Sequence, residues 1–157
     1  MLTPLSPVSP NFEALRALNN DHALELSFAD APRFSHLVAN AFFAAHIGTE
    51  AFIIAFDQDV DYDSPNFIWF RQRFSRFVYV DRVVTATAAR GRGHAAALYK
   101  ALFAAAKAAG HEHVTCEINA DPPNPGSEAF HAKFGFQDIG SALLPNGKTV
   151  RYYERRI

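Results

Sequence analysis

The sequence contains a single cysteine, Cys116, so the chain cannot form an internal disulfide. It also lacks a charge excess, since 15 lysines and arginines stand against 16 aspartates and glutamates. This balance argues against general binding to nucleic acids or anionic membranes. No apolar run approaches the roughly 20 residues of a membrane span, and residues 1–12 lack the basic and apolar regions of a secretory signal. We therefore expect a cytoplasmic protein with no nucleic-acid or membrane partner.

Hydrophobic residues make up 49% of the 157 positions, which is typical of a folded globular domain. The length suits one domain over residues 1–157 better than two. Three prolines fall within residues 1–10, and proline disfavours helix in the residue before it. We therefore expect residues 1–10 to form an extended lead-in to a single domain.

Apolar periodicity and turn residues predict alternating helices and strands. The first half is predicted to contain a helix over 11–20, a strand over 24–28, a helix that is capped by Asp30 and stops near Gly48, and a strand over 51–56. The second half is predicted to contain a long loop over 57–76 with a helical turn at 66–74, a strand over 77–85, a helix to Ala109, a strand over 113–119, a short helix over 127–134, and a hairpin of 136–144 with 148–155. The strand–helix–strand crossover requires a parallel pair, and the closing hairpin adds antiparallel pairs. The expected fold is α/β, with a mixed sheet flanked by helices.

The stretch ARGRGHAAAL, residues 89–98, places two glycines and two arginines directly before an alanine-rich helix. The first turn of a helix has backbone N–H groups without partners and a partial positive charge. Glycine lets a ligand approach this backbone closely, and arginine adds a fixed charge. The stretch therefore predicts a phosphate or pyrophosphate site. It matches neither the Walker A pattern nor the dinucleotide fingerprint, which would need glycine at Ala96.

This stretch resembles the acetyl-CoA-binding motif of the GNAT superfamily of N-acetyltransferases, a strand end followed by [RQ]-x-x-G-x-[GA]. Arg90, Gly93 and Ala95 match the fixed positions, and Thr87 stands where a proline is usual. The resemblance implies a single domain with a largely antiparallel sheet around a central parallel pair, and acetyl-CoA as cosubstrate. The cofactor-binding residues that it implies are Val83, Val84, Thr85, Arg90, Gly91, Arg92, Gly93, His94, Ala95 and Asn124.

A second segment, NPGSEAFHAKFGF at residues 124–136, is similar to a later GNAT motif. Most members have a tyrosine at the position of His131, where it acts as the acid that protonates the departing thiolate. A histidine here, with Ser127 four residues earlier, resembles the phosphinothricin-type branch. The segment also resembles a bacterial subgroup that carries PPNPGS and FH at this position. We interpret His131 as the candidate acid, because an imidazolium can donate a proton near neutral pH; the alternative is a histidine on the helix surface.

Two carboxylates are candidates for the catalytic base. Glu117 lies on the strand that follows the long helix, where some GNAT members carry a catalytic glutamate; the alternative is a solvated strand carboxylate. Asp81 interrupts the apolar strand FVYVDRVV, so it should be paired or functional. Alternation predicts that Arg82 points to the opposite face, and a structural ion pair is the alternative for Asp81. A water chain could replace either base.

The acceptor is expected to lie against the long loop, with Tyr62, Asp63, Asn66 and Trp69 as candidate acceptor-binding residues. The alternative is that the loop's aromatic residues form core. His111, His113 and Cys116 lack a further ligand at a suitable spacing, so no metal is expected.

The predicted function is acetyl-CoA-dependent transfer of an acetyl group to a primary amine of a small molecule, with amino-acid-like acceptors favoured. The alternatives are a protein N-acetyltransferase, a non-catalytic acyl-CoA-binding or sensor domain, and a partner-binding module that uses an exposed aromatic loop over residues 62–74. Dimers are common in the GNAT superfamily, so a homodimer is possible; no residue pattern decides it.

Overall fold

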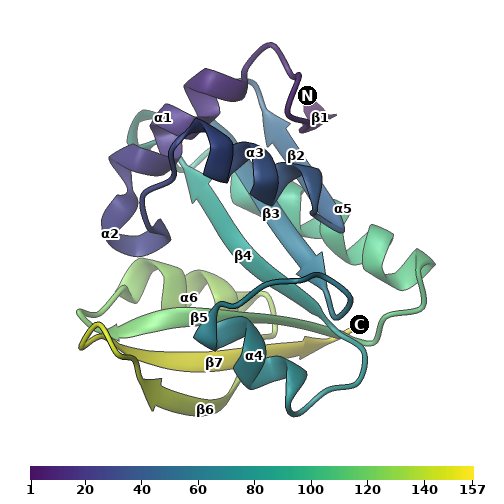
Figure 1. The fold of residues 1–157 in the computed structure, drawn as a ribbon, viewed down its shortest axis with the longest axis vertical. Coiled ribbons are helices and arrows are strands. Elements are labelled where there is room, and N and C mark those ends of the chain that lie inside the picture. Colours follow the sequence, from purple (N-terminus) through teal and green to yellow (C-terminus); the bar gives the residue numbers. More distant parts are fainter.

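The computed structural model describes residues 1–157 and contains one seven-stranded sheet with the order β1-β2-β3-β4-β5-β7-β6 (Figure 1). The strands are β1 (Leu2–Pro4), β2 (Phe43–Ile47), β3 (Ala51–Asp57), β4 (Val78–Thr85), β5 (His113–Asp121), β6 (Gln137–Leu143) and β7 (Thr149–Arg156). All neighbouring strands are antiparallel except the central pair, β4 and β5, which is parallel. The predicted mixed sheet with a central parallel pair is confirmed.

The parallel pair is joined at only one end. Val78 pairs with Val114 and Tyr79 with Thr115, and no further residues of the two strands pair. Beyond these pairs β4 continues to Thr85 and β5 to Asp121, so the sheet splits into two parts that diverge in Figure 1. The split leaves the facing edges of β4 and β5 without strand partners, which opens the middle of the sheet to a ligand.

Seven helical segments cover the sheet: α1 (Phe12–Asp21), α2 (Ala23–Leu26), α3 (Ala31–Ala39), α4 (Pro65–Arg71), the 3₁₀ turn Thr87–Ala89, α5 (His94–Ala108) and α6 (Pro125–Lys133). One core joins α1, α3 and α4 to one face of the sheet, for example through Leu15, Phe34 and Phe67. The second core joins α5 to the other face, for example through Leu98 and Leu102, and Phe130 of α6 packs against it. None of these helices has both the length and the hydropathy needed to cross a membrane.

Two predictions for the first half of the chain are wrong. Residues 24–28, expected as a strand, contain the end of α2, and Leu24 and Phe28 remain 63% and 67% exposed. Their alternation therefore reflects no buried sheet face. The second helix begins as predicted, since Asp30 Oδ1 accepts from the Arg33 N–H at 2.9 Å, but it ends at Ala39 and not near Gly48. Residues 43–47 form β2 because β1 and β3 pair with it on both sides, and this tertiary pairing overrides the helical spacing.

The other predicted elements agree with the structure to within a few residues, including the strand that became β4, the long helix α5 and the closing β6–β7 hairpin. The lead-in over residues 1–10 is extended at its start, but Leu2–Pro4 also joins the sheet as the edge strand β1. An edge position tolerates Pro4, because its missing N–H can face away from the sheet.

Candidate active site

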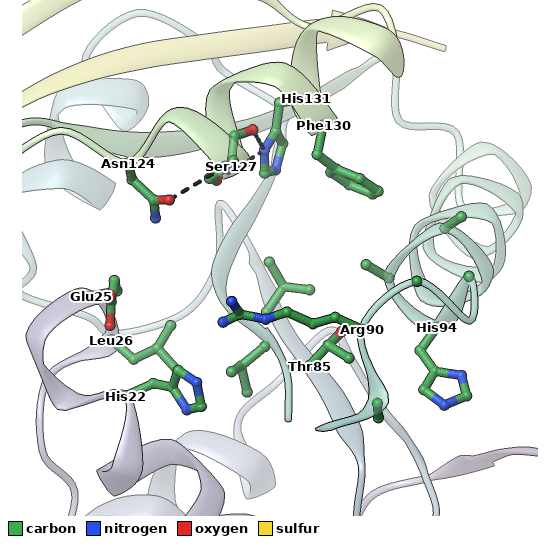
Figure 2. A pocket seen from close by; sticks show the side chains of 18 residues that line it. His22, Glu25, Leu26, Thr85, Arg90, His94, Asn124, Ser127, Phe130 and His131 are labelled. Atoms are coloured by element: carbon green, nitrogen blue, oxygen red, sulfur yellow. Dashed lines mark hydrogen bonds between the residues drawn. The ribbon is translucent and has the colours of Figure 1, made fainter. Parts of the chain in front are cut away.

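A cleft of about 590 Å³ opens at the split of the sheet (Figure 2). Four segments line it: the end of β4, the loop and first turn of α5, the start of α6, and the region of α2. The lining residues are His22, Glu25, Leu26, Val83, Val84, Thr85, Ala89, Arg90, Gly91, Gly93, His94, Ala95, Ala96, Asn124, Gly126, Ser127, Phe130 and His131. The cleft thus contains every predicted cofactor-binding residue except Arg92.

The loop before α5 presents free backbone donors to this cleft. Gly91 and Gly93 have φ values of +83° and +80°, which favour glycine, and an added Cβ at either would project into open space. Gly93 caps α5 without any side-chain cap, and the N–H groups of residues 91–96 have no acceptor within the protein. A row of unpaired amides at the start of a 15-residue helix fits an anionic group such as a pyrophosphate.

The two arginines of the loop have different surroundings. Arg92 turns out of the cleft and pairs with Glu50 at 3.1 Å, and the same Glu50 oxygen contacts His94 Nε2 at 2.9 Å. The hydrogen bond from His94 and the nearby Arg92 lower the pKa of Glu50. Arg90 forms no ion pair within the protein, and in Figure 2 its side chain extends into the cleft. Arg90 is therefore the cation available to a bound anion.

Asn124 and Ser127 form the wall opposite α2 in Figure 2. The Asn124 Oδ1 accepts from the Ser127 N–H at 3.3 Å and caps α6. Because this bond uses the oxygen, the Nδ2 donor of Asn124 stays free on the cleft side. The cap therefore fixes an amide donor at the rim of the split.

His131 is only 4% exposed, so the alternative of a helix-surface histidine is wrong. Its Nδ1 lies 2.8 Å from the Ser127 carbonyl oxygen and 3.2 Å from the Ser127 hydroxyl, and its Nε2 lies 2.6 Å from the Tyr99 hydroxyl. A carbonyl can only accept, so Nδ1 carries the proton and Nε2 accepts from Tyr99. Burial lowers the pKa of His131, and the ring is therefore mostly neutral near pH 7. This does not favour the imidazolium expected from the sequence.

Glu117 lies two residues beyond the last β4–β5 pair, at the fork of the split. It is partly buried; the Tyr79 O–H donates to its Oε2 at 2.7 Å, and the Asn66 Nδ2 donates to its Oε1 at 3.1 Å. Burial raises the pKa of Glu117 to about 7, and the negative charge of Asp81 adds to this rise. The two hydrogen bonds, the partial burial and the pKa raised toward that of a general base argue against the alternative of a solvated strand carboxylate.

Asp81 is the extra residue of a β-bulge in β4, because Arg82 pairs with Ile54 while Val80 pairs with the next residue, Ala55. The bulge breaks the alternation and brings Asp81 and Arg82 together, so the prediction that Arg82 points to the opposite face is wrong. Arg82 Nε contacts Asp81 Oδ2 at 3.0 Å, and both side chains are nearly buried. The Tyr62 O–H donates to the other Asp81 oxygen at 2.8 Å. This geometry favours the structural ion pair over a free base.

The predicted acceptor residues lie outside the cleft. Asn66 contacts Glu117, Tyr62 contacts Asp81, and Asp63 is exposed. Trp69 has both faces covered, by Tyr152 at 4.1 Å between centroids and by the Arg73 guanidinium at 3.5 Å. The indole therefore offers no free face for stacking on an acceptor.

The aromatic loop is largely closed by its own chain. Phe67 and Phe70 are fully buried, so the prediction of a partner-binding module with an exposed aromatic loop is wrong. The sequence analysis missed His22, Glu25 and Leu26, which line the cleft from α2 and the residue before it. Only a correct helix prediction there could have found them, because the sequence resembled a strand.

Residues 66–136 match the model of the acetyltransferase (GNAT) family. No curated protein matches the sequence. The structure is similar to that of the NatC complex bound to Gag peptide and CoA, with a TM-score of 0.75 and 10% identity over 100% of this chain and 98% of that one. It is also similar to an aminoglycoside 6'-N-acetyltransferase complexed with coenzyme A (TM-score 0.73, 11% identity, 99% and 96% covered). A third similar structure is NAA60 from Arabidopsis thaliana in complex with acetyl-CoA (TM-score 0.69, 14% identity, 100% and 99% covered).

The chain has the GNAT acetyltransferase fold. The matched segment begins in α4 and ends after α6, so it includes the β4–β5 split, the loop before α5, Glu117 and His131. The family match and the GNAT fold together support an N-acetyltransferase. The match also covers the cleft-lining residues from Val83 to His131, but not His22, Glu25 and Leu26.

Proposed function

We propose that the protein is an acetyl-CoA-dependent N-acetyltransferase that acts on a primary amine of a small molecule, with amino-acid-like acceptors favoured. The observation that carries the proposal is the split between β4 and β5. A row of free amides lies at the cleft on the α5 side, and a carboxylate with a pKa of about 7 lies at the fork. This combination suits the meeting of an anionic carrier with an amine that must lose a proton.

Acetyl-CoA supplies an activated acyl group, and the residues around the cleft fit its binding. The free amides of residues 91–96 and the charge of Arg90 would hold the pyrophosphate. The unpaired edge of β4 at Val83–Thr85 would bond to the pantetheine amides in the manner of an added strand. The free Nδ2 of Asn124 would donate to the same arm from the other side of the cleft.

Glu117 is the proposed base. The acceptor enters as an ammonium, and Glu117 accepts one of its protons, which frees the nitrogen lone pair for attack on the acetyl carbon. As the C–N bond forms and the C–S bond breaks, the sulfur leaves with the electron pair. The nitrogen then loses its second proton to solvent, and the thiolate gains a proton from solvent. The Ser127 hydroxyl, which lines the cleft and lies 3.2 Å from His131 Nδ1, can hydrogen-bond to the departing sulfur. Since His131 is neutral, we assign it hydrogen bonding to Ser127 and no proton transfer.

The contact between α2 and the β6–β7 turn supports a small acceptor. Lys148 Nζ donates to the Leu24 carbonyl at 2.6 Å, which ties the turn to α2 beside the cleft. An opening bridged in this way admits a narrow amine more readily than a folded protein surface. An extended protein N-terminus could also pass, and it is the second acceptor class to be tested.

The test is release of the CoA thiol from acetyl-CoA in the presence of amino acids, polyamines, aminoglycosides or short peptides. The internal thiol does not interfere with a thiol reagent, because Cys116 is 3% exposed. We expect release with one class of small amine, and loss of most of that release in Glu117→Gln. Release with peptides alone would identify a protein N-acetyltransferase. Tight CoA binding with no release for any amine would overturn the enzyme proposal in favour of a binding or sensor domain.

A further inference from the structure

Ser27, which follows α2, has a strained backbone. Its φ of 69° and ψ of 136° make it the one residue other than glycine with a positive φ. Such a conformation is unfavourable for a residue with a Cβ, and it persists only where the surroundings hold it. Observed strain of this kind, two residues beyond the cleft-lining Glu25, calls for a structural cause.

The cause is the buried side chain of Arg82. Its Nη1 donates to the Ser27 carbonyl oxygen at 2.8 Å and to Asn19 Oδ1 at 2.9 Å. Asn19 in turn donates from Nδ2 to the same Ser27 oxygen at 3.0 Å. Two donors therefore fix this one carbonyl, and one of them is a charged group that is 5% exposed.

The other end of the arginine fork is bound to the bulge in β4. Arg82 Nε contacts Asp81 Oδ2, and the Tyr62 hydroxyl donates to the other oxygen of the same carboxylate. Arg82 thus connects a fixed point of the sheet, beside the split, to the end of α2. Lysine could not make the same set of contacts, because an ammonium lacks the planar fork.

The segment held in this way borders the split on the face opposite the CoA loop. Leu26 packs against the core formed with α1, α3 and α4, whereas α5 and α6 pack on the other face. Glu117 also lies on the Leu26 side, since its partners Tyr79 and Asn66 belong to that layer. His22, Glu25 and Leu26 therefore line the cleft on the same side of the sheet as Glu117, although Glu117 itself is not one of the lining residues.

We propose that Arg82 is a positioning residue for acceptor binding: it sets the place of α2, and α2 forms the acceptor wall of the cleft. This inference rests on the proposed acetyltransferase function. Arg82 itself does not line the cleft, so its effect passes through Ser27 and α2. Loss of the fork should weaken acceptor binding and leave the CoA loop intact.

The first test compares Arg82→Lys with the parent protein by hydrogen exchange, CoA calorimetry and steady-state kinetics. Loss of a charged hydrogen bond predicts about tenfold faster exchange at the amides of Glu25, Leu26 and Ser27, which bond within this segment. The acceptor KM is expected to rise about tenfold, while the Kd for CoA and kcat change less than about threefold. A merely structural role would change all three kinetic quantities together.

Arg151→Lys is the matched control, because Arg151 pairs with the surface residue Asp138 and does not contact α2. If Arg82→Lys fails to fold, Asn19→Ala replaces it: that variant removes the bonds of Asn19 to Arg82 and to the Ser27 carbonyl, together with its bond to Asn20, and keeps the Arg82–Asp81 ion pair. A parent protein inactive on every amine would overturn the proposed function. An active parent whose variant keeps its acceptor KM, or keeps its exchange rates over residues 23–28, would overturn only the assignment of Arg82.

Discussion

Replacing Glu117 by glutamine should increase the stability of the protein at alkaline pH while it removes activity. The carboxyl has an ordinary pKa of 4.5, and burial raises it to about 7 in the folded protein. Between these values the folded state keeps a proton that the unfolded state releases, so the free energy of unfolding falls as the pH rises. The shift of the Glu117 pKa corresponds to a loss of about 3 kcal/mol in the free energy of unfolding, and this loss is complete above pH 7. Glutamine has no proton to lose, so Glu117→Gln should be more stable than the parent at pH 8 and similar to it at pH 4.5.

Urea unfolding of both proteins across this pH range measures the difference directly. Glu112→Gln is the control, because Glu112 precedes the same strand but is exposed, and its replacement should not change the pH dependence. The rate of acetyl transfer by the parent should rise through pH 7 as Glu117 ionises. In Glu117→Gln this rate should be lower by a factor of about 10²–10⁴. A stability difference that stays constant with pH, or a parent rate that stays flat through pH 7, would refute the reasoning.

Three further predictions concern other parts of the site. Gly93→Ala should weaken CoA binding about tenfold, because its Cβ would project into the space in front of the free amides before α5. Gly110→Ala, at the other end of α5 with a similar φ of +85°, should lose comparable stability and keep its affinity for CoA. Equal CoA affinities of the two variants in calorimetry would contradict the anion site. Because burial lowers the pKa of His131, kcat should not fall as the pH rises above 7, and a fall there would restore the imidazolium acid. Asp81→Ala should cost about 3 kcal/mol in urea unfolding by leaving Arg82 buried without its partner, and a loss below about 1 kcal/mol would argue against the ion pair.

The sequence predicted the second half of the fold well because its local signals agree with the tertiary structure. β4 is rich in β-branched residues, and α5 begins and ends at glycines with positive φ. The same signals located the loop at Arg90–Ala95, which lines the cleft with the exception of Arg92. In such segments propensity, periodicity and packing favour the same structure.

The first half could not be predicted in the same way, because long-range pairing decides it. Phe43–Ile47 fits a helical stripe by spacing, yet β1 and β3 on either side make it a strand. The bulge at Asp81 has no local sequence signal, and without it the ion pair with Arg82 could not be expected. The lowered pKa of His131 likewise depends on burial, which only the folded chain provides.

Because β4 and β5 are joined at only one end, the two halves of the sheet can move relative to each other. The facing strands of the two half-sheets are connected by two backbone pairs, by the bond from the Thr115 hydroxyl to the Val78 carbonyl at 3.0 Å, and by the bond from the Tyr79 hydroxyl to Glu117 at 2.7 Å. The half-sheets β1–β4 and β5–β7 are therefore two rigid units joined at a narrow hinge. A ligand that bonds to the free edges of both β4 and β5 would connect the two half-sheets along the split, and their relative motion would decrease when it binds. Under this view the fold reaches its full rigidity only together with its substrate.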